Sequence, residues 1–66
     1  MKSDFDTIND MLESAGIIHR QDWNREDSSL GNTKIVKWIS VPSKTSEICF
    51  VFDYDGKLEK VESYAL

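Results

Sequence analysis

Only one stretch of this 66-residue chain, residues 3–15, has the apolar spacing of a helix, whereas most of the rest favours strands. Its apolar side chains recur at intervals of three and four residues, without an interrupting Gly or Pro: Phe5, Ile8, Met11, Leu12 and Ala15. Ser3 or Asp4 can cap its start, and Gly16 follows its last apolar residue, where a left-handed cap favours glycine. A single helix covers only one face of a sheet.

Three downstream segments have the composition of strands: 34–41, 47–53 and 57–64. Residues 17–24 alternate in polarity and predict either a fourth strand or an irregular extended segment. Residues 25–33 are polar and rich in turn formers, which predicts a loop. We therefore predict a single α+β domain, residues 1–66, with one N-terminal helix packed on a three- to four-stranded antiparallel sheet.

The Asp-Gly pair at 55–56 predicts a tight hairpin but leaves its register open. A two-residue turn places Val61 beside Phe50, whereas a three-residue turn places Leu58 beside Phe52. The sequence alone does not decide between these two registers.

Both faces of the predicted sheet carry apolar side chains. The heavier face should receive the helix and carries three large residues: Ile48, Phe50 and Phe52. The opposite face carries Val36, Trp38 and Val51, and it has no second helix to cover it unless the segment with Trp23 and Leu30 folds back. An uncovered apolar patch on a small protein commonly marks a contact surface. The alternative is that Trp23 and lysine stems shield this face.

The chain has a net charge of −4, and residues 1–33 hold all of this excess, with seven acids against three bases. Asp6, Asp10 and Glu13 form an acidic ridge almost opposite the apolar stripe of the helix. The acidic ridge is either a solvated face that keeps the protein soluble or a docking surface for a basic partner. The most specific version of the docking hypothesis is that these carboxylates mimic the phosphates of a nucleic acid. The modest net charge weighs against such mimicry.

Groups that would support catalysis or metal binding are scarce. Cys49 lies in a strand between apolar neighbours, where a thiol acts as a small hydrophobe, and His19 is the only imidazole. Asp53-x-Asp55-Gly56 is similar to the start of a calcium loop, but Leu58 and Tyr64 occupy the positions that need Gly and Glu. We expect no catalytic residue, no metal and no cofactor, and hence a protein that is not an enzyme.

Direct nucleic-acid binding is disfavoured, because acids interleave with the lysines around Trp38 and no RNA-recognition motif is present. The longest apolar run, residues 48–52, is far shorter than the ~20 residues that span a bilayer. The N-terminal residues lack an apolar signal region. We expect a cytoplasmic protein that does not cross a membrane.

The hairpin Phe50-Val-Phe-Asp-Tyr-Asp-Gly-Lys-Leu58, preceded by a helix that closes in Ala15-Gly16-Ile17, resembles short uncharacterised accessory proteins of phages, prophages and Gram-positive bacteria. A similar hairpin occurs in BamE-like and PepSY-like domains. The chain lacks the lipobox cysteine and second helix of the former and the signal peptide of the latter. The resemblance implies a stand-alone protein that acts by binding, in the host cytoplasm if it is phage-encoded.

These features predict a non-catalytic protein-binding modulator, such as a phage- or mobile-element-encoded inhibitor of a host defence or regulatory protein. Its candidate contact residues lie on the Trp38 face and the acidic ridge: Trp38, Val36, Val51, Trp23, Asp6, Asp10 and Glu13. Two alternatives stay open. One is a homodimeric accessory domain whose Trp38 face completes its own core, and the other is an acidic nucleic-acid mimic.

Overall fold

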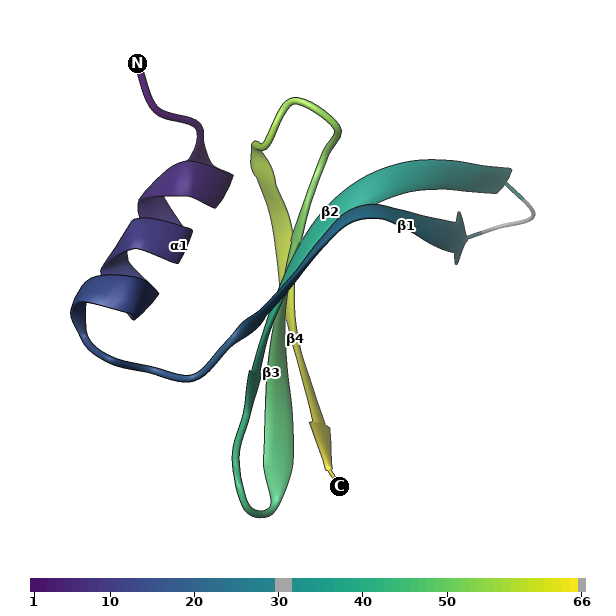
Figure 1. Ribbon diagram of the computed structural model, residues 1–66. Coiled ribbons are helices and arrows are strands. Elements are labelled where there is room, and N and C mark those ends of the chain that lie inside the picture. The colour runs from purple at the N-terminus through teal and green to yellow at the C-terminus, as the bar shows by residue number, and fades with distance from the viewer. Residues whose placement is uncertain (30–31, 66) are drawn as a thin grey trace.

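The computed structural model describes residues 1–29 and 32–65 as one helix and a four-stranded antiparallel sheet (Figure 1). The elements in chain order are α1 (Asp4–Ser14), β1 (Arg20–Ser29), β2 (Asn32–Pro42), β3 (Ser46–Phe52) and β4 (Leu58–Ala65). The strands lie in the sheet in the same order as in the chain. This confirms the predicted α+β class with an N-terminal helix. Within the described residues, no helix is long and apolar enough to cross a membrane.

The helix begins and ends at the residues that the capping signals indicate. The Ser3 hydroxyl accepts a hydrogen bond from the Asp6 amide at 3.2 Å, which satisfies one of the free amides of the first turn. At the other end, the Ala15 amide donates to the Met11 carbonyl at 3.0 Å. Gly16 follows with φ +69°, a conformation that glycine adopts at little cost.

Residues 25–33, which we predicted as a loop, are instead mostly strand. β1 extends to Ser29 and β2 begins at Asn32, and residues 25–29 of β1 pair with residues 32–36 of β2. The paired backbone of β2 outweighs the low strand propensity of these polar residues, because strand propensity depends strongly on context. Leu30 lies outside the described residues, so its predicted covering role stays a prediction.

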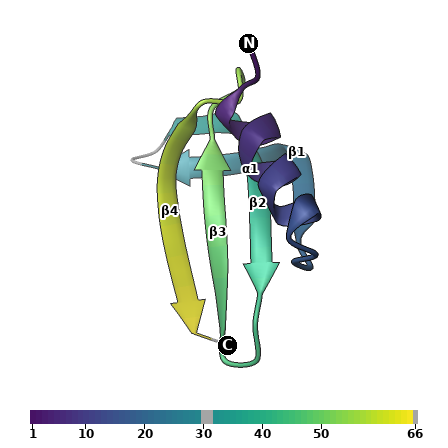
Figure 2. The same cartoon turned by 90° about the vertical axis from the view of Figure 1, so that its left-hand side faces the viewer.

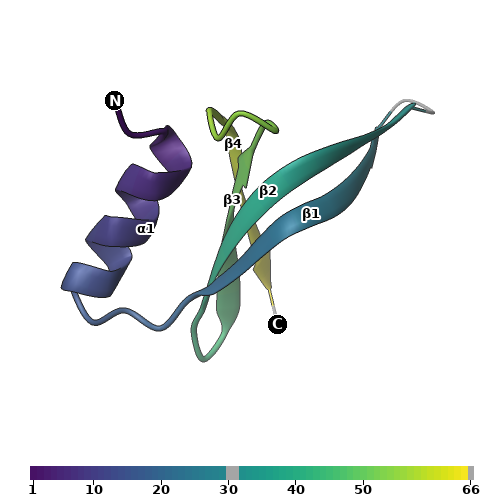
Figure 3. The same ribbon diagram turned by 45° about the horizontal axis from the view of Figure 1, so that its top comes forward.

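A register shift between Asp22 and Arg25 interrupts the pairing of β1 with β2. Such an irregularity bends a strand and increases its twist. Beyond this point the β1–β2 hairpin turns away from the helix and crosses behind β3 and β4 (Figure 2). Figure 3 shows α1 and the far half of the hairpin on opposite sides of β3 and β4. The far half of the hairpin therefore extends from the sheet on its second face, by which we mean the face away from α1.

The helix packs on the sheet face that carries Phe50 and Phe52, as predicted. Phe5 is fully buried, and its ring meets the ring of Phe52 edge-on at a centroid distance of 5.2 Å. The remaining members of this core are Ile39, Ile8, Leu12, Phe50 and Leu58. Ala15, the last residue of the predicted apolar stripe, is exposed because it caps the helix beyond this core.

The second face is not the uncovered patch that the single helix led us to expect. Val36 and Val51 are fully buried, as is the Cys49 thiol, whereas Trp38 is half-buried. The bent β1–β2 hairpin extends on this side of the sheet, for which the sequence provided no second helix. Val36 and Val51 therefore serve the core and present no surface to a partner, and only Trp38 of this group remains accessible in part.

The β3–β4 hairpin contains both of the registers that the sequence left open. Phe50 pairs with Val61, and Phe52 pairs with Leu58, because a register shift separates the two pairs. The turn has three residues: the Asp53 amide donates to the carbonyl of Lys57 at 2.8 Å, as in a hairpin whose turn includes one bulged residue.

This turn docks directly on the first turn of α1. The Gly56 carbonyl accepts a hydrogen bond from the Phe5 amide at 2.9 Å, and the Asp4 carboxylate accepts one from the Leu58 amide at 2.9 Å. Gly56 has φ +89°, and a Cβ there would lie 2.8 Å from Cβ and from Oγ of Ser3. Glycine is therefore needed at position 56 both for the turn and for the close approach of the helix.

We predict that Gly56→Ala costs more stability than Gly16→Ala, although both glycines have positive φ. The conformation alone should cost about 1–2 kcal/mol at either position. At position 56 the overlap with the capping residue Ser3 should add about 1–3 kcal/mol, whereas no atom lies within 4 Å of a Cβ at position 16. Urea unfolding of both variants measures the difference, and equal losses would show that the turn does not pack tightly on α1.

Candidate protein-binding surfaces

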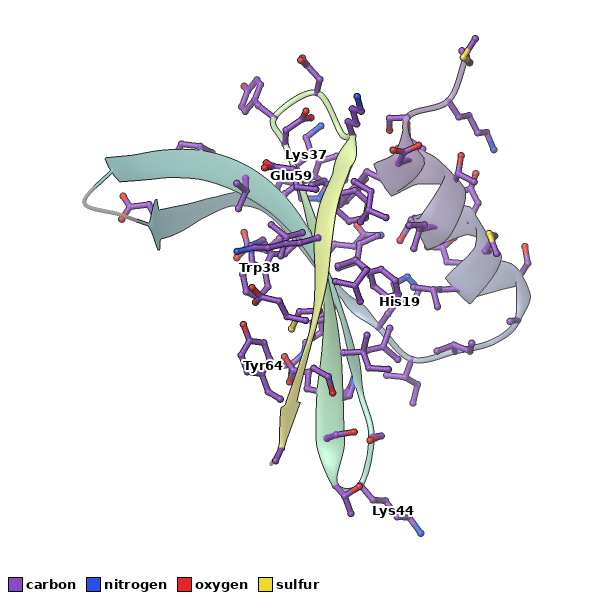
Figure 4. The ribbon with its side chains drawn as sticks, turned by 180° about the vertical axis from the view of Figure 1, so that it is seen from behind. His19, Lys37, Trp38, Lys44, Glu59 and Tyr64 are labelled. Carbon is purple, nitrogen blue, oxygen red and sulfur yellow. The ribbon has the colours of Figure 1, made fainter. Side chains whose placement is uncertain are left out.

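The second face contains a shallow hollow of about 260 Å³ where β1, β2 and β3 meet, which we call the second-face hollow. Its lining residues are Arg20, Gln21, Asp22, Trp38, Ser40 and Glu47. The register brings them together, because Asp22 pairs with Trp38 and Arg20 pairs with Ser40. In Figure 4, Trp38 and Tyr64 lie on the side of the sheet away from the helix, whereas His19 lies on the helix side.

Acidic groups outnumber basic ones in the second-face hollow. The carboxylates are those of Asp22 and Glu47, and the one guanidinium is that of Arg20. A nitrogen of Arg20 lies 3.5 Å from a Glu47 carboxylate oxygen, and the Arg20 side chain is 72% exposed. An exposed pair at this distance adds little stability. The hollow thus combines an indole with carboxylates, an arrangement that attracts a cation through the ring face and through charge.

The acidic ridge is interrupted by a basic residue from outside the helix. Asp6 and Glu13 are exposed, but Asp10 is half-buried and forms an ion pair with the Lys2 ammonium. The hydrogen bond to Asp10 and the charge of its carboxylate raise the pKa of Lys2. The middle acid of the ridge is therefore neutralised, which a helical wheel could not show, because Lys2 precedes the helix.

Trp23 lies on the helix side of the sheet and does not shield Trp38. Its ring packs against Phe5 at a centroid distance of 4.7 Å. The Lys37 ammonium lies 5.3 Å from the Trp23 ring centroid, 5.6 Å from that of Phe5 and 6.0 Å from that of Tyr54. These contacts stabilise the junction of the helix, β2 and the β3–β4 turn. The sequence analysis missed this group, because its members come from four separate segments.

The single histidine has a structural environment. His19 Nε2 lies 2.9 Å from the side-chain oxygen of Asn9, which also accepts a hydrogen bond from Gln21, and His19 Nδ1 lies 2.7 Å from the Ile17 carbonyl oxygen. These contacts join α1 to the start of β1. Within the described part of the chain, no group of three or more His, Cys, Asp or Glu side chains is placed to hold a metal ion.

A polar cluster lies on the second face of β4. The Lys60 ammonium lies 3.0 Å from one Glu62 carboxylate oxygen, and the Tyr64 hydroxyl donates to the other. The hydrogen bond from Tyr64, followed by that from Lys60, lowers the pKa of Glu62. The same Glu62 hydrogen bond raises the pKa of Tyr64. Glu62 is therefore the centre of this cluster.

We predict that Glu62→Gln lowers the pH at which the Tyr64 phenol ionises. The raised pKa belongs to the folded chain, so its contribution to stability is complete below a pH of about 10 and is lost as the pH rises through the folded-state pKa. An absorbance titration of the phenolate measures the shift, and Tyr64→Phe identifies which tyrosine is responsible. An unchanged Tyr64 titration in Glu62→Gln would contradict the hydrogen bond.

No family model, curated protein or solved structure matches this chain, so its candidate surfaces are judged by their own geometry.

Proposed function

We propose that this protein is a non-catalytic protein-binding modulator that holds a lysine or arginine side chain of its partner in the second-face hollow. The observation that supports this proposal is the placement of the Trp38 indole beside Asp22 and Glu47 in one concave site. A volume of about 260 Å³ lies below the ~300–1,000 Å³ of sites for drug-sized molecules. The hollow is therefore suited to a single side chain rather than to a whole small molecule.

A cation that enters the second-face hollow would replace the weak contact between Arg20 and Glu47 with stronger contacts of its own. Glu47 now lies 3.5 Å from Arg20, whose exposed side chain can move aside at little cost. An incoming guanidinium could bind the Glu47 carboxylate through two parallel hydrogen bonds and lie against the indole of Trp38. Arginine is favoured over lysine, because its planar group can make both contacts together.

The charge of the whole chain supports a basic partner. With a net charge of −4, the protein attracts basic segments over longer distances and repels phosphates. The acidic ridge has less support as the contact surface, because Lys2 pairs with Asp10 at its centre. Partner binding should therefore weaken as salt is added, and mutations in the hollow should weaken it more than mutations on the ridge.

We predict that Asp22→Asn combined with Glu47→Gln weakens the binding of an arginine-containing peptide by about tenfold or more, because two charged hydrogen-bond acceptors are lost. The peptide (Gly-Arg)₄ serves as the probe. A Trp23→Phe background leaves Trp38 as the only tryptophan, so its fluorescence reports occupancy of the hollow. Titrations with the peptide give the dissociation constants.

The matched control is Asp6→Asn combined with Glu13→Gln, which changes the net charge by the same amount on the acidic ridge. This control should retain most of the affinity and the Trp38 response. Circular dichroism checks that each variant is folded. Equal weakening by both double variants would mean that the peptide responds only to net charge, and it would overturn the assignment of the hollow.

A further inference from the structure

The outer edge of β4 is a second surface, separate from the second-face hollow. In the sheet order β1-β2-β3-β4, β4 pairs with β3 on one side, and no other described strand pairs with it. Figure 2 shows α1 over the β1–β2 side of the sheet, away from β4. One edge of an eight-residue strand therefore presents backbone amides and carbonyls that another strand could pair with.

The β4 edge lacks several of the features that normally prevent edge-to-edge pairing. It contains neither Pro nor Gly, and its register shift lies at its start, opposite Phe52. From Lys60 to Ala65 the strand pairs with β3 without interruption. Proteins commonly protect such an edge with a bulge, a proline or charges that repel a second strand. Charged side chains are the remaining feature of β4 that could prevent edge pairing. The pattern of these charges therefore decides which strand can pair with β4.

The charges of β4 are self-complementary in one antiparallel register. Lys60 and Glu62 lie on the same face, because alternate residues of a strand point the same way. If Val61 lies on the twofold axis between two copies, each Lys60 lies opposite Glu62 of the second copy. Such cross-strand pairs of opposite charge favour association.

Other antiparallel registers also keep the corresponding faces of the two sheets on the same side. Their charge pairs are less favourable. An axis through Glu59, Lys60 or Glu62 places two identical charges opposite each other, which opposes pairing. An axis through Ser63 creates no pair of opposite charges. Among axes through residues 59–63, the register centred on Val61 is therefore the one that the charge pattern selects.

The same register also covers exposed apolar surface. Val61 is 53% exposed on the helix side of the sheet, and it would lie against Val61 of the second copy. Ile48, on the neighbouring strand, is 41% exposed beside this position. Apolar contact on one face and opposite charges on the other both favour the same pairing.

We propose that two copies of this chain associate through antiparallel pairing of their β4 edges, centred on Val61, to form one continuous eight-stranded sheet. The occupant of the edge is thus a second copy, which meets it with the same patch, as in most symmetric dimers. The strand pairing joins the two β4 edges. The second-face hollow, built from β1, β2 and β3, stays open in each copy, so this inference is independent of the proposed function.

Reversing the charge at position 60 or at position 62 tests the proposal. Lys60→Glu and Glu62→Lys should each raise the dimer dissociation constant by about tenfold or more, because each places like charges opposite each other twice. Sedimentation velocity over a dilution series measures this constant for each variant and for the wild type. The matched control is Lys57→Glu, which makes the same charge change opposite the uncharged Ala65 of the second copy and should leave the dimer intact.

Mixing the two single variants gives the sharper test. One variant then carries acids at both positions and the other carries lysines at both, so the pair is complementary again, and the mixture should form a heterodimer. The lost intrachain pair between Lys60 and Glu62 cannot explain this recovery, because it is broken in both chains.

Three results would overturn the proposal. They are a monomeric wild type throughout the dilution series, a dimer that survives both single variants, and a mixture that stays monomeric although each variant is folded by circular dichroism.

Discussion

The bend in the β1–β2 hairpin is the feature on which the rest of the structure depends. A chain with one helix would otherwise leave one sheet face in water, yet Val36 and Val51 are fully buried on the face without the helix. Burial of a valine contributes about 1.5 kcal/mol or more, which matters in a domain of 66 residues. The register shift after Asp22 permits the bend, so one local irregularity turns the hairpin toward the face that has no helix.

The same bend places the second-face hollow. Asp22 precedes the register shift and still pairs with Trp38, whereas the residues beyond it turn across the back of β3 and β4. The indole is therefore half covered by its own chain and half open beside the carboxylates. Val36 and Val51 are fully buried, so they add no exposed apolar surface beside Trp38. Beside Trp38 lies a small hollow with a polar rim, which is the geometry that the proposed recognition of one charged side chain requires.

How well the sequence predicts a feature depends on whether the interactions that determine it are local or join segments that are far apart in the chain. The helix is fixed by local spacing and by Ser3 and Gly16, so the sequence predicted both its ends. Residues 25–33 were predicted wrongly, because their strand state depends on pairing with β2 and not on their own propensity. The β3–β4 register was undecidable, because a bulge combines both alternatives. Among the site residues, Trp23 was assigned to the wrong face for the same nonlocal reason.

The two surfaces that we propose for binding lie at different ends of the sheet order, and this separation has a consequence for affinity. A twofold axis through β4 and perpendicular to the sheet would leave both second-face hollows on the same side of an eight-stranded sheet. Two basic segments of one partner, or of a partner that is itself a dimer, could then bind together, and the second contact would form at a high effective concentration. A single cation in a hollow of this size binds weakly by itself, so the proposed pairing of β4 would strengthen the binding of the proposed partner.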